Sequence, residues 1–395
     1  MGFRQHTTQV ITGIGRYAIT RDCDLIFLNC YPLSIYVTVY LFIMVLSLSD
    51  MFKKNIRQFI MSFILIGLVI FVAGRGGIGA DGYNYVYSWE ATATLSDQSL
   101  EPSVPLAYAE PGYYYFTVLI KSIYDNLFFY FAILSLLTLS FLFSSLRQYS
   151  IYPLMGLVVY MARYFMLRDF NQIRAAAAIA IIIYATKFIA QRNARKFFAY
   201  WFLALLFHSS MVIALPFYWL DRLRPSRKQL YQIIATAFLL SIAINQLFKD
   251  VINYISQTLN ILTAYTGDSE MAEGSGMLNP MIYFQLITLL LFIKAEHYLK
   301  DKQPYYYTLR NGYLYSTVIL MVFSSLMVIG SRLSTVFATY DIFIIPALFS
   351  ILNRKSRCFV GPLLYALLML LFLINLSRAG QNMNEYGQLY TISAF

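Results

Sequence analysis

Residues 196–220 read KFFAYWFLALLFHSSMVIALPFYWL, an apolar run with the polar residues His208, Ser209 and Ser210 at its centre. Basic residues lie at both ends of this run, namely Arg192, Arg195, Lys196, Arg222, Arg224, Arg227 and Lys228. Basic loops of membrane proteins stay on the cytoplasmic side, so both ends are predicted to be cytoplasmic. We therefore expect a broken helix or re-entrant hairpin that turns near His208, which is tolerated where the backbone is buried or lines a cavity. The alternative is one ordinary span followed by a basic outer loop.

The composition is that of an integral membrane protein. Of the 395 residues, 59% are hydrophobic and 12% are charged, and the mean hydropathy is +0.59, unlike a soluble domain. The net charge of +11 comes mostly from short loops, which indicates membrane topology and no nucleic-acid binding. The three cysteines form no metal or disulfide pattern, and the sequence has no P-loop or metal-binding motif, so no metal and no cofactor are expected.

Apolar runs long enough to cross a bilayer recur along the chain. They lie at 32–49, 58–74, 127–146, 152–167, 172–190, 196–220, 229–247, 279–294, 311–330, 333–352 and 358–376. The sequence therefore predicts an all-α, polytopic membrane protein with about eleven membrane segments, one of them broken or re-entrant.

The basic residues orient this single membrane domain, predicted over 32–376. Lys53, Lys54 and Arg57 place the segment 50–57, between the first two apolar runs, in the cytoplasm. Alternation then makes the loops 75–126 and 248–278 external, together with a tail over 377–395. Residues 1–31 are expected to form an N-terminal interfacial segment, for which the sequence indicates no role.

The first candidate cluster begins at Arg75, at the end of an apolar run. Five glycines lie within residues 74–82, and glycine permits close approach of the backbone to a ligand. Arg75 can bind a phosphate through two hydrogen bonds, and Asp81 can orient a sugar hydroxyl or act as a base. The alternative is a flexible turn in which Arg75 reaches the lipid headgroups.

The second cluster is Glu110-Pro111-Gly112-Tyr113. Proline fits the first turn of a helix, and a carboxylate just before it favours the helix dipole. This capping role competes with a catalytic role for Glu110. The aromatic stretch that continues to Tyr124 is predicted to be a helix lying along the outer interface.

The third cluster extends from Arg163 to Arg174. Asn171 is a plausible N-cap for the alanine-rich helix that begins at Gln172. Arg174 then lies in the first turn, where a cation opposes the helix dipole. An anion bound by Arg168, Arg174 and the free N–H groups would explain this arrangement. The alternative is an ion pair with Asp169 and contacts to lipid phosphates.

Two further residues complete the candidates. His208 is the one histidine within an apolar run, where imidazole can serve as a base or as a hydrogen-bond donor, although it can also stabilise a broken helix. Arg332, in Gly330-Ser331-Arg332, is predicted at an outer turn between two spans.

The motifs form one series: Arg75 with Gly79, Asp81 and Tyr85; Glu110-Pro111-Gly112; Arg168 with Gln172-Ile173-Arg174-Ala175; Phe207-His208-Ser209 with Pro216; and Arg332. This series resembles the EpsG-like family of bacterial polysaccharide polymerases, which is grouped with the Wzy-type O-antigen and capsule polymerases. The resemblance covers roughly residues 33–350, with a loose match after Arg332.

The resemblance implies a GT-C-like, metal-independent membrane glycosyltransferase at the outer face of the bacterial inner membrane. Such an enzyme transfers the growing glycan from undecaprenyl diphosphate to the non-reducing end of an incoming undecaprenyl-diphosphate-linked repeat unit. A chain-length regulator and a flippase in the same membrane are implied partners. The diphosphates and glycan would be bound by Arg75, Arg168, Gln172, Arg174, Arg332, Tyr85 and Tyr113. One of His208, Asp81 and Glu110 would activate the acceptor hydroxyl.

Two other functions stay open at this point. An O-antigen ligase would carry one large external loop with its own histidine and arginine, whereas the segment 248–278 is short and has neither. A flippase or transporter would place cations within many spans and would show repeat symmetry, which the sequence lacks.

Overall fold

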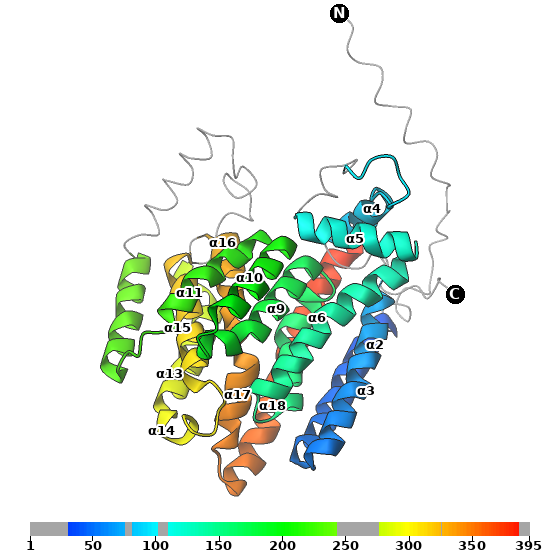
Figure 1. The fold of residues 1–395 in the computed structure, drawn as a ribbon. Coiled ribbons are helices and arrows are strands. Elements are labelled where there is room, and N and C mark those ends of the chain that lie inside the picture. Colours follow the sequence, from blue (N-terminus) through cyan, green and yellow to red (C-terminus); the bar gives the residue numbers. More distant parts are fainter. Residues whose placement is uncertain (1–30, 76–80, 102–109, 243–275, 325, 387–395) are drawn as a thin grey trace, which may run out of the picture.

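The computed structural model describes residues 31–75, 81–101, 110–242, 276–324 and 326–386. These residues form helices and turns without a strand, so the predicted all-α fold class is confirmed for them (Figure 1). The predicted N-terminal segment 1–31 and outer loop 248–278 lie almost wholly outside the described residues.

The described helices, in chain order, are α2 (Tyr31–Leu46), α3 (Lys54–Ala73), α4 (Gly82–Glu90), α5 (Pro111–Ile123), α6 (Leu127–Tyr149), α7 (Pro153–Tyr160), α8 (Met166–Arg168), α9 (Ile173–Ala190), α10 (Ala194–Phe207), α11 (Ala214–Leu220), a helix over 227–242, α13 (Pro280–Lys294), α14 (Glu296–Leu299), α15 (Tyr306–Val322), α16 (Met327–Ala338), α17 (Asp341–Ser350) and α18 (Arg354–Tyr386). Shorter turns of helix join them, namely the 3₁₀ helix η1 (Ser47–Met51), the π-helix η2 (Met161–Phe165) and the 3₁₀ helices η3 (Ser209–Ile213) and η5 (Gly276–Leu278).

Several helices begin where the sequence supplies a polar cap. The side chains of Asn126, Asn193 and Asn279 accept hydrogen bonds from the first turns of α6, α10 and α13. Each satisfies one backbone N–H that has no partner inside its helix. Capping thus fixes where these apolar helices start.

Four of the described helices are long and apolar enough to cross a membrane, namely α3, α6, α9 and residues 354–379 of α18. A fifth span results if α16 and α17, which are bent by 44° at residues 339–340, form one crossing. The other predicted runs are shorter helices, so the count of about eleven spans stays a prediction. Helix α18 continues to Tyr386, so the first residues of the predicted tail over 377–395 are helical.

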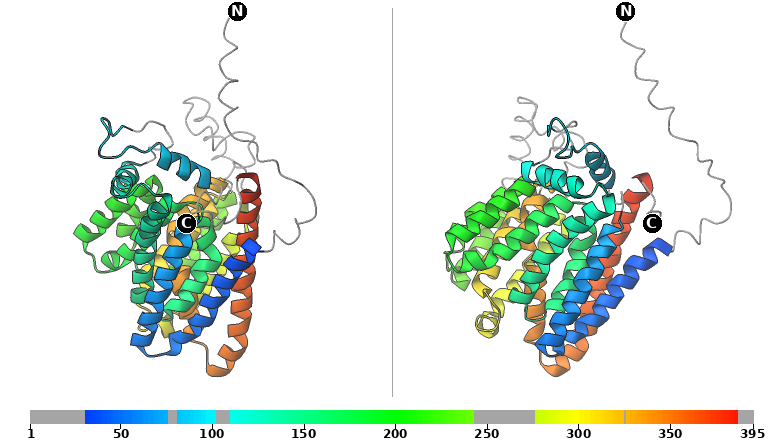
Figure 2. Two further views of the ribbon diagram at one scale, coloured as in Figure 1. Left: turned by 90° about the vertical axis from the view of Figure 1, so that its right-hand side faces the viewer. Right: turned by 45° about the vertical axis from the view of Figure 1, so that its right-hand side comes forward.

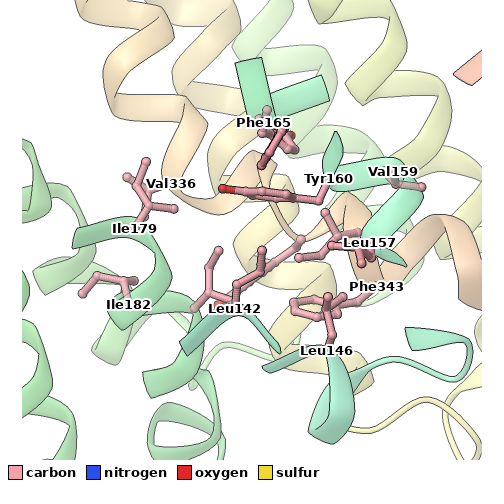
Figure 3. Packing of buried hydrophobic residues seen from close by; sticks show 14 of the residues in the cluster. Leu142, Leu146, Leu157, Val159, Tyr160, Phe165, Ile179, Ile182, Val336 and Phe343 are labelled. Atoms are coloured by element: carbon pink, nitrogen blue, oxygen red, sulfur yellow. The ribbon is translucent and has the colours of Figure 1, made fainter. Parts of the chain in front are cut away.

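Helix α9 is the centre of the bundle. It packs against α6 and α10 through a row of buried alanines and isoleucines, and small side chains allow helices in a membrane to approach closely. The apolar core around it joins α6, α7, α9, α16 and α17 (Figure 3). Among its members are Leu142, Leu146, Leu157, Val159, Tyr160, Phe165, Ile179, Ile182, Val336 and Phe343.

The run 196–220 forms a hairpin. His208 has an extended backbone between α10 and η3, and the chain then returns, so that Phe197 stacks on Tyr218. The two ends meet where Arg192 donates hydrogen bonds to the Tyr218 carbonyl at 3.0 Å and to Asp221 Oδ2 at 3.0 Å. The predicted reversal at His208 is confirmed; the cytoplasmic position of both ends stays a prediction.

Helices α4 and α5 lie across one end of the bundle (Figures 1 and 2). This end is the one predicted to be external, and it is called the outer end below; the opposite end is the inner end. The predicted helix before Tyr124 is α5. Lys121 of α5 is buried, and its Nζ donates to the carbonyl oxygens of Trp89 and Thr92, both at 2.8 Å. The lysine therefore caps the C-terminus of α4 and fixes α4 against α5.

A substitution at Gly156 of α7 tests how tightly α7 packs on α17. A Cβ at this position would lie 2.5 Å from the backbone oxygen of Ile342. Gly156→Ala is expected to lower the free energy of unfolding by about 1–3 kcal/mol, because a backbone atom cannot move aside. Thermal unfolding of the purified chain in detergent measures the effect. Gly67→Ala in α3 is the matched control, because its Cβ would meet no atom within 4 Å among the described residues. Equal melting temperatures for the two variants would contradict the packing.

Candidate functional site

Glu110 lies at the centre of a polar cluster at the outer end. It is buried, and its Oε2 accepts a hydrogen bond from Arg174 Nη1 at 2.7 Å. Its Oε1 accepts hydrogen bonds from the backbone N–H of Ser209 at 3.1 Å and from the Ser209 hydroxyl at 3.3 Å. Charge-assisted hydrogen bonds of this kind are the strong ones. One carboxylate thus joins the start of α5 to α9 and to the turn of the hairpin.

The position that the capping alternative gave to Glu110, just before the first turn of α5, is the one it occupies, but its side chain does not cap the helix. Glu110 occupies the N-cap position and Pro111 the first turn, as expected, but the carboxylate makes no capping hydrogen bond. Arg174 and Ser209 bind it instead. Gly112 allows this arrangement, because a Cβ there would lie 2.8 Å from the backbone oxygen of Leu206 in α10.

Arg174 lies in the first turn of α9, as predicted. Its guanidinium carbon is 5.5 Å from the centre of the Tyr113 ring, and its side chain is 27% exposed. Tyr85 of α4 lies within electrostatic range of the same guanidinium. A cation opposes the dipole at a helix N-terminus, and Glu110 supplies compensating charge. The exposed part of the guanidinium is accessible to a second anion.

The prediction that Asn171 is the N-cap of α9 is wrong. Gln172 occupies that position without a capping hydrogen bond from its side chain, and the helix begins at Ile173. Asn171 Oδ1 accepts a hydrogen bond from the backbone N–H of Asp81 at 2.8 Å. The asparagine thus joins the start of α4 to the start of α9, which places Asp81 beside the cluster.

Asp81 and Arg332 belong to the same electrostatic environment. Burial raises the pKa of Asp81 above its usual value, and the positive charges of Arg174, Arg332 and Arg75 oppose this rise. Arg332 is exposed on α16. The structure therefore brings Asp81, Glu110, Arg174 and Arg332 to one place.

The turn predicted at Gly330-Ser331-Arg332 is wrong. These residues lie within α16, and α15 ends earlier, at Val322. Gly330 packs against the preceding turn, since a Cβ there would lie 2.6 Å from the backbone oxygen of Phe323. The glycine serves close packing and does not turn the chain.

His208 is half-buried at the tip of the hairpin. Its Nδ1 accepts a hydrogen bond from the backbone N–H of Ser210 at 3.3 Å and lies 2.7 Å from the Ser210 hydroxyl. A ring nitrogen that accepts an N–H carries no proton, so the neutral imidazole holds its proton on Nε2. His208 is thereby prepared to donate a hydrogen bond from Nε2.

Arg75 lies beneath the cluster and is not open to solvent. It is 1% exposed, its Nη1 donates to the backbone oxygen of Asp169 at 2.7 Å, and its guanidinium faces the rings of Phe131 and Tyr85. Its Nε and Nη2 have no hydrogen-bond partner among the described residues. The predicted phosphate contact would therefore require this part of the structure to open.

Arg168 is likewise turned inward. It is 2% exposed, and its Nη2 donates to the hydroxyls of Thr335 at 2.8 Å and Thr339 at 2.6 Å. Its guanidinium lies 4.0 Å from the centre of the Tyr164 ring. The structure does not bring Arg168 to the cluster, and its contacts connect α8 to α16.

Sequence reasoning did not identify a buried ion pair between Arg163 of η2 and Asp341 of α17. Tyr164 donates a hydrogen bond to Asp341 Oδ2 at 2.8 Å. Both charges lie within predicted apolar runs, and opposite charges inside a membrane domain tend to pair. That rule could have predicted the contact. No metal is needed to explain it, and the described residues contain no group of three His, Cys, Asp or Glu residues that could hold one.

Fold and site together define a multi-pass helical membrane protein with arginines, carboxylates and a histidine gathered at one end of its bundle. The model of the EpsG family matches residues 58–388, most of the chain. The chain belongs to the EpsG family, which is consistent with a membrane protein of polysaccharide biosynthesis. No curated protein and no solved structure matches the chain.

Substitution of Glu110 tests the connection between the three elements. Glu110→Ala is expected to lower the free energy of unfolding by about 1–3 kcal/mol, because Arg174 and the Ser209 N–H lose their acceptor. Glu110→Gln should cost less, since an amide oxygen still accepts from Ser209. Melting temperatures in detergent check the order, with the exposed Glu90→Gln of α4 as control. An Ala variant as stable as the wild type would contradict the connection.

Proposed function

We propose that this protein polymerises lipid-linked oligosaccharide repeat units at the outer face of the bacterial inner membrane. In this proposal, the growing glycan leaves undecaprenyl diphosphate and joins the non-reducing end of an incoming undecaprenyl-diphosphate-linked repeat unit. One observation carries the proposal: Arg174 and Arg332, two carboxylates and His208 lie together at the end of the bundle that the basic loops predict to be external. Family membership supports it.

The reaction breaks the bond between the anomeric carbon of the donor glycan and the diphosphate oxygen. The acceptor hydroxyl forms the new glycosidic bond and loses its proton to a base, while undecaprenyl diphosphate leaves with the bonding electrons. Negative charge grows on the leaving diphosphate. Arg174 and Arg332 are the accessible cations of the cluster, and fixed positive charge lowers the barrier where such charge develops.

Asp81 is the base that the geometry favours. Glu110 is held by Arg174 and Ser209, so its charge is already compensated. No described residue hydrogen-bonds the Asp81 carboxylate, and burial raises its pKa, which makes it a stronger proton acceptor. The Nε2–H of His208 is then available to donate to a phosphate oxygen of the substrate.

Arg75 and Arg168 take a different role in this scheme. Both are buried, and their contacts to Asp169, Thr335 and Thr339 place them behind the exposed cations. We assign them to positioning of α4, α8 and α16. The predicted contribution of Gln172, Tyr85 and Tyr113 to substrate binding remains part of the proposal, since all three lie at or beside Arg174.

The polysaccharide ladder of a complemented deletion strain tests the function. Arg174→Ala is expected to lower polymerisation about a hundredfold, because one charge-stabilising donor is removed. The ladder should collapse to a single repeat unit on the surface. Arg195→Ala, an exposed arginine at the other end of α10, is the matched control at equal expression. Loss of all surface glycan, including the single unit, would instead favour a flippase or an O-antigen ligase.

Substitutions at His208 test whether its side chain donates a hydrogen bond or removes a proton from the acceptor hydroxyl. His208→Gln retains an N–H group and should keep a measurable part of the wild-type polymerisation rate, whereas His208→Ala should lose about a hundredfold. Membrane vesicles supplied with lipid-linked repeat units give these rates. Equal rates for the two variants would oppose a donor role for Nε2.

The role of Asp81 as the base predicts how the polymerisation rate depends on pH. Protonation removes the base, so the wild-type rate should fall as the pH drops through the folded-state pKa of Asp81, which burial raises above the usual value. The fall should therefore begin at a higher pH than for an ordinary aspartate. Asp81→Asn should leave a low rate without this acidic limb. An unchanged acidic limb in the Asn variant would assign the base to another residue.

A further inference from the structure

A second basic site lies at the inner end, far from the cluster around Glu110. A cavity of about 320 Å³ opens between the start of the helix over 227–242, α14 and the start of α15. Figure 1 places α14 at the end of the bundle opposite to α4 and α5. The cavity is lined by Pro225, Ser226, Arg227, Glu296, His297, Lys300 and Tyr307. The volume is within the range of small-ligand sites.

The charges around this inner cavity are mostly positive. Arg227 and Lys300 line it, and Arg224 and Arg310 face the Tyr307 ring with their guanidinium carbons 5.2 and 5.0 Å from its centre. Arg310 is only 2% exposed. Burial of a guanidinium is costly unless negative charge is close. Positively charged side chains therefore outnumber the Glu296 carboxylate around the cavity.

Glu296 is the one carboxylate in the lining, and it forms long ion pairs with Arg227 and Arg310. It accepts a hydrogen bond from Tyr307 at 3.2 Å, but Arg227 Nε and Arg310 Nη1 lie 3.8 and 3.7 Å from its Oε2. Charge-assisted hydrogen bonds between arginine and carboxylate are near 2.7–2.9 Å. The buried Arg310 is held by this ion pair and by hydrogen bonds from its Nε and Nη2 to Asn311, whereas the half-exposed guanidinium of Arg227 retains capacity to bind another anion.

The adjoining helix adds a second observation. Gln229 Oε1 accepts a hydrogen bond from the Ser226 N–H at 2.8 Å, which marks the N-terminus of the helix over 227–242 at the cavity. Arg227 and Lys228 lie in the first turn, where the helix dipole disfavours cations. An anion between this N-terminus and Lys300 would compensate the positive charges of Arg227 and Lys228 and would interact favourably with the helix dipole.

The positive-inside rule explains why basic residues are at this end, but not their arrangement. Topology requires only that lysines and arginines stay in cytoplasmic water. It does not require that basic residues from separate elements line one cavity. The convergence of three separate elements indicates a ligand.

We propose that the inner cavity binds a phosphate-bearing anion, supplied either by an anionic phospholipid headgroup or by a soluble phosphate compound. Arg227 and Lys300 bind the phosphate oxygens directly, while Arg310 adds positive charge from behind. This site is separate from the proposed polymerase reaction and does not depend on it.

Thermal unfolding of the full chain, purified in neutral detergent, tests the site. The probes are dihexanoyl phosphatidylglycerol, inorganic phosphate and, as the uncharged comparison, dihexanoyl phosphatidylcholine. A ligand of the folded state raises the melting temperature in proportion to its occupancy. We expect one or both anions to stabilise the protein, and phosphatidylcholine not to. Stabilisation by the lipid alone identifies a headgroup site; stabilisation by inorganic phosphate as well identifies a site for soluble phosphates.

Substitutions inside and outside the cavity lining test whether the anions bind in the cavity. The double substitution Arg227→Gln with Lys300→Gln should weaken apparent affinity about a hundredfold, at roughly tenfold for each charged contact. Lys294→Gln with Lys302→Gln removes two exposed charges from the same end, outside the cavity lining, and should leave affinity unchanged. Glu296→Gln should tighten binding several-fold, because a competing carboxylate is lost and the Tyr307 contact is kept.

All titrations are repeated with Arg174→Ala, so that anion binding at the outer end is measured separately. Stabilisation that is lost with Arg174→Ala but kept in the Arg227/Lys300 double variant would overturn the inner site without affecting the proposed function. The proposal also fails if no anion stabilises the wild type, or if the control double variant weakens binding as much as the cavity variant does.

Discussion

The hydrogen bonds of the Glu110 carboxylate hold the outer end of this protein together. They connect α5, which lies across the bundle, to the first turn of α9 and to the tip of the hairpin. The same contact compensates Arg174 at the unfavourable end of a helix dipole and fixes the backbone from which His208 projects. The position of α5, the charge balance of Arg174 and the orientation of His208 thus depend on the buried side chain of Glu110.

Beneath this cluster, the cost of burying charge in a membrane domain explains the remaining polar contacts. Arg75 binds the backbone oxygen of Asp169, Arg168 binds Thr335 of α16 and Thr339 just after it, and Arg163 pairs with Asp341. Charges inside a membrane protein are tolerated when they are paired or hydrogen-bonded within the bundle. Arg75, Arg168 and Arg163 are therefore buried and connect helices, whereas Arg174 and Arg332 at the outer end are partly or fully exposed.

The two ends of the bundle carry basic residues for different reasons. At the inner end, positive charge is expected from topology, and only its concave arrangement around the cavity near Lys300 indicates a ligand. At the outer end, the positive charge itself is unusual, and carboxylates accompany it. The proposed reaction, with a diphosphate leaving group and an acceptor hydroxyl, needs this combination of cation and base, whereas a simple phosphate site needs only the cations.

Much of the architecture could be predicted from the sequence alone. Apolar runs placed helices such as α6, α9 and α13 to within a few residues, and basic loops predicted the reversal at His208, because span length and charge asymmetry are local properties; the runs 311–330 and 333–352 did not predict where α15 ends and α16 begins. Proximity in the sequence also grouped Glu110 with α5 and Asn171 with α9, and there it misled. Both side chains bond to elements distant in the sequence. Hydrophobic pattern determines which segments can enter the membrane, but only tertiary packing decides which partner a polar side chain meets, and hence which arginines remain accessible.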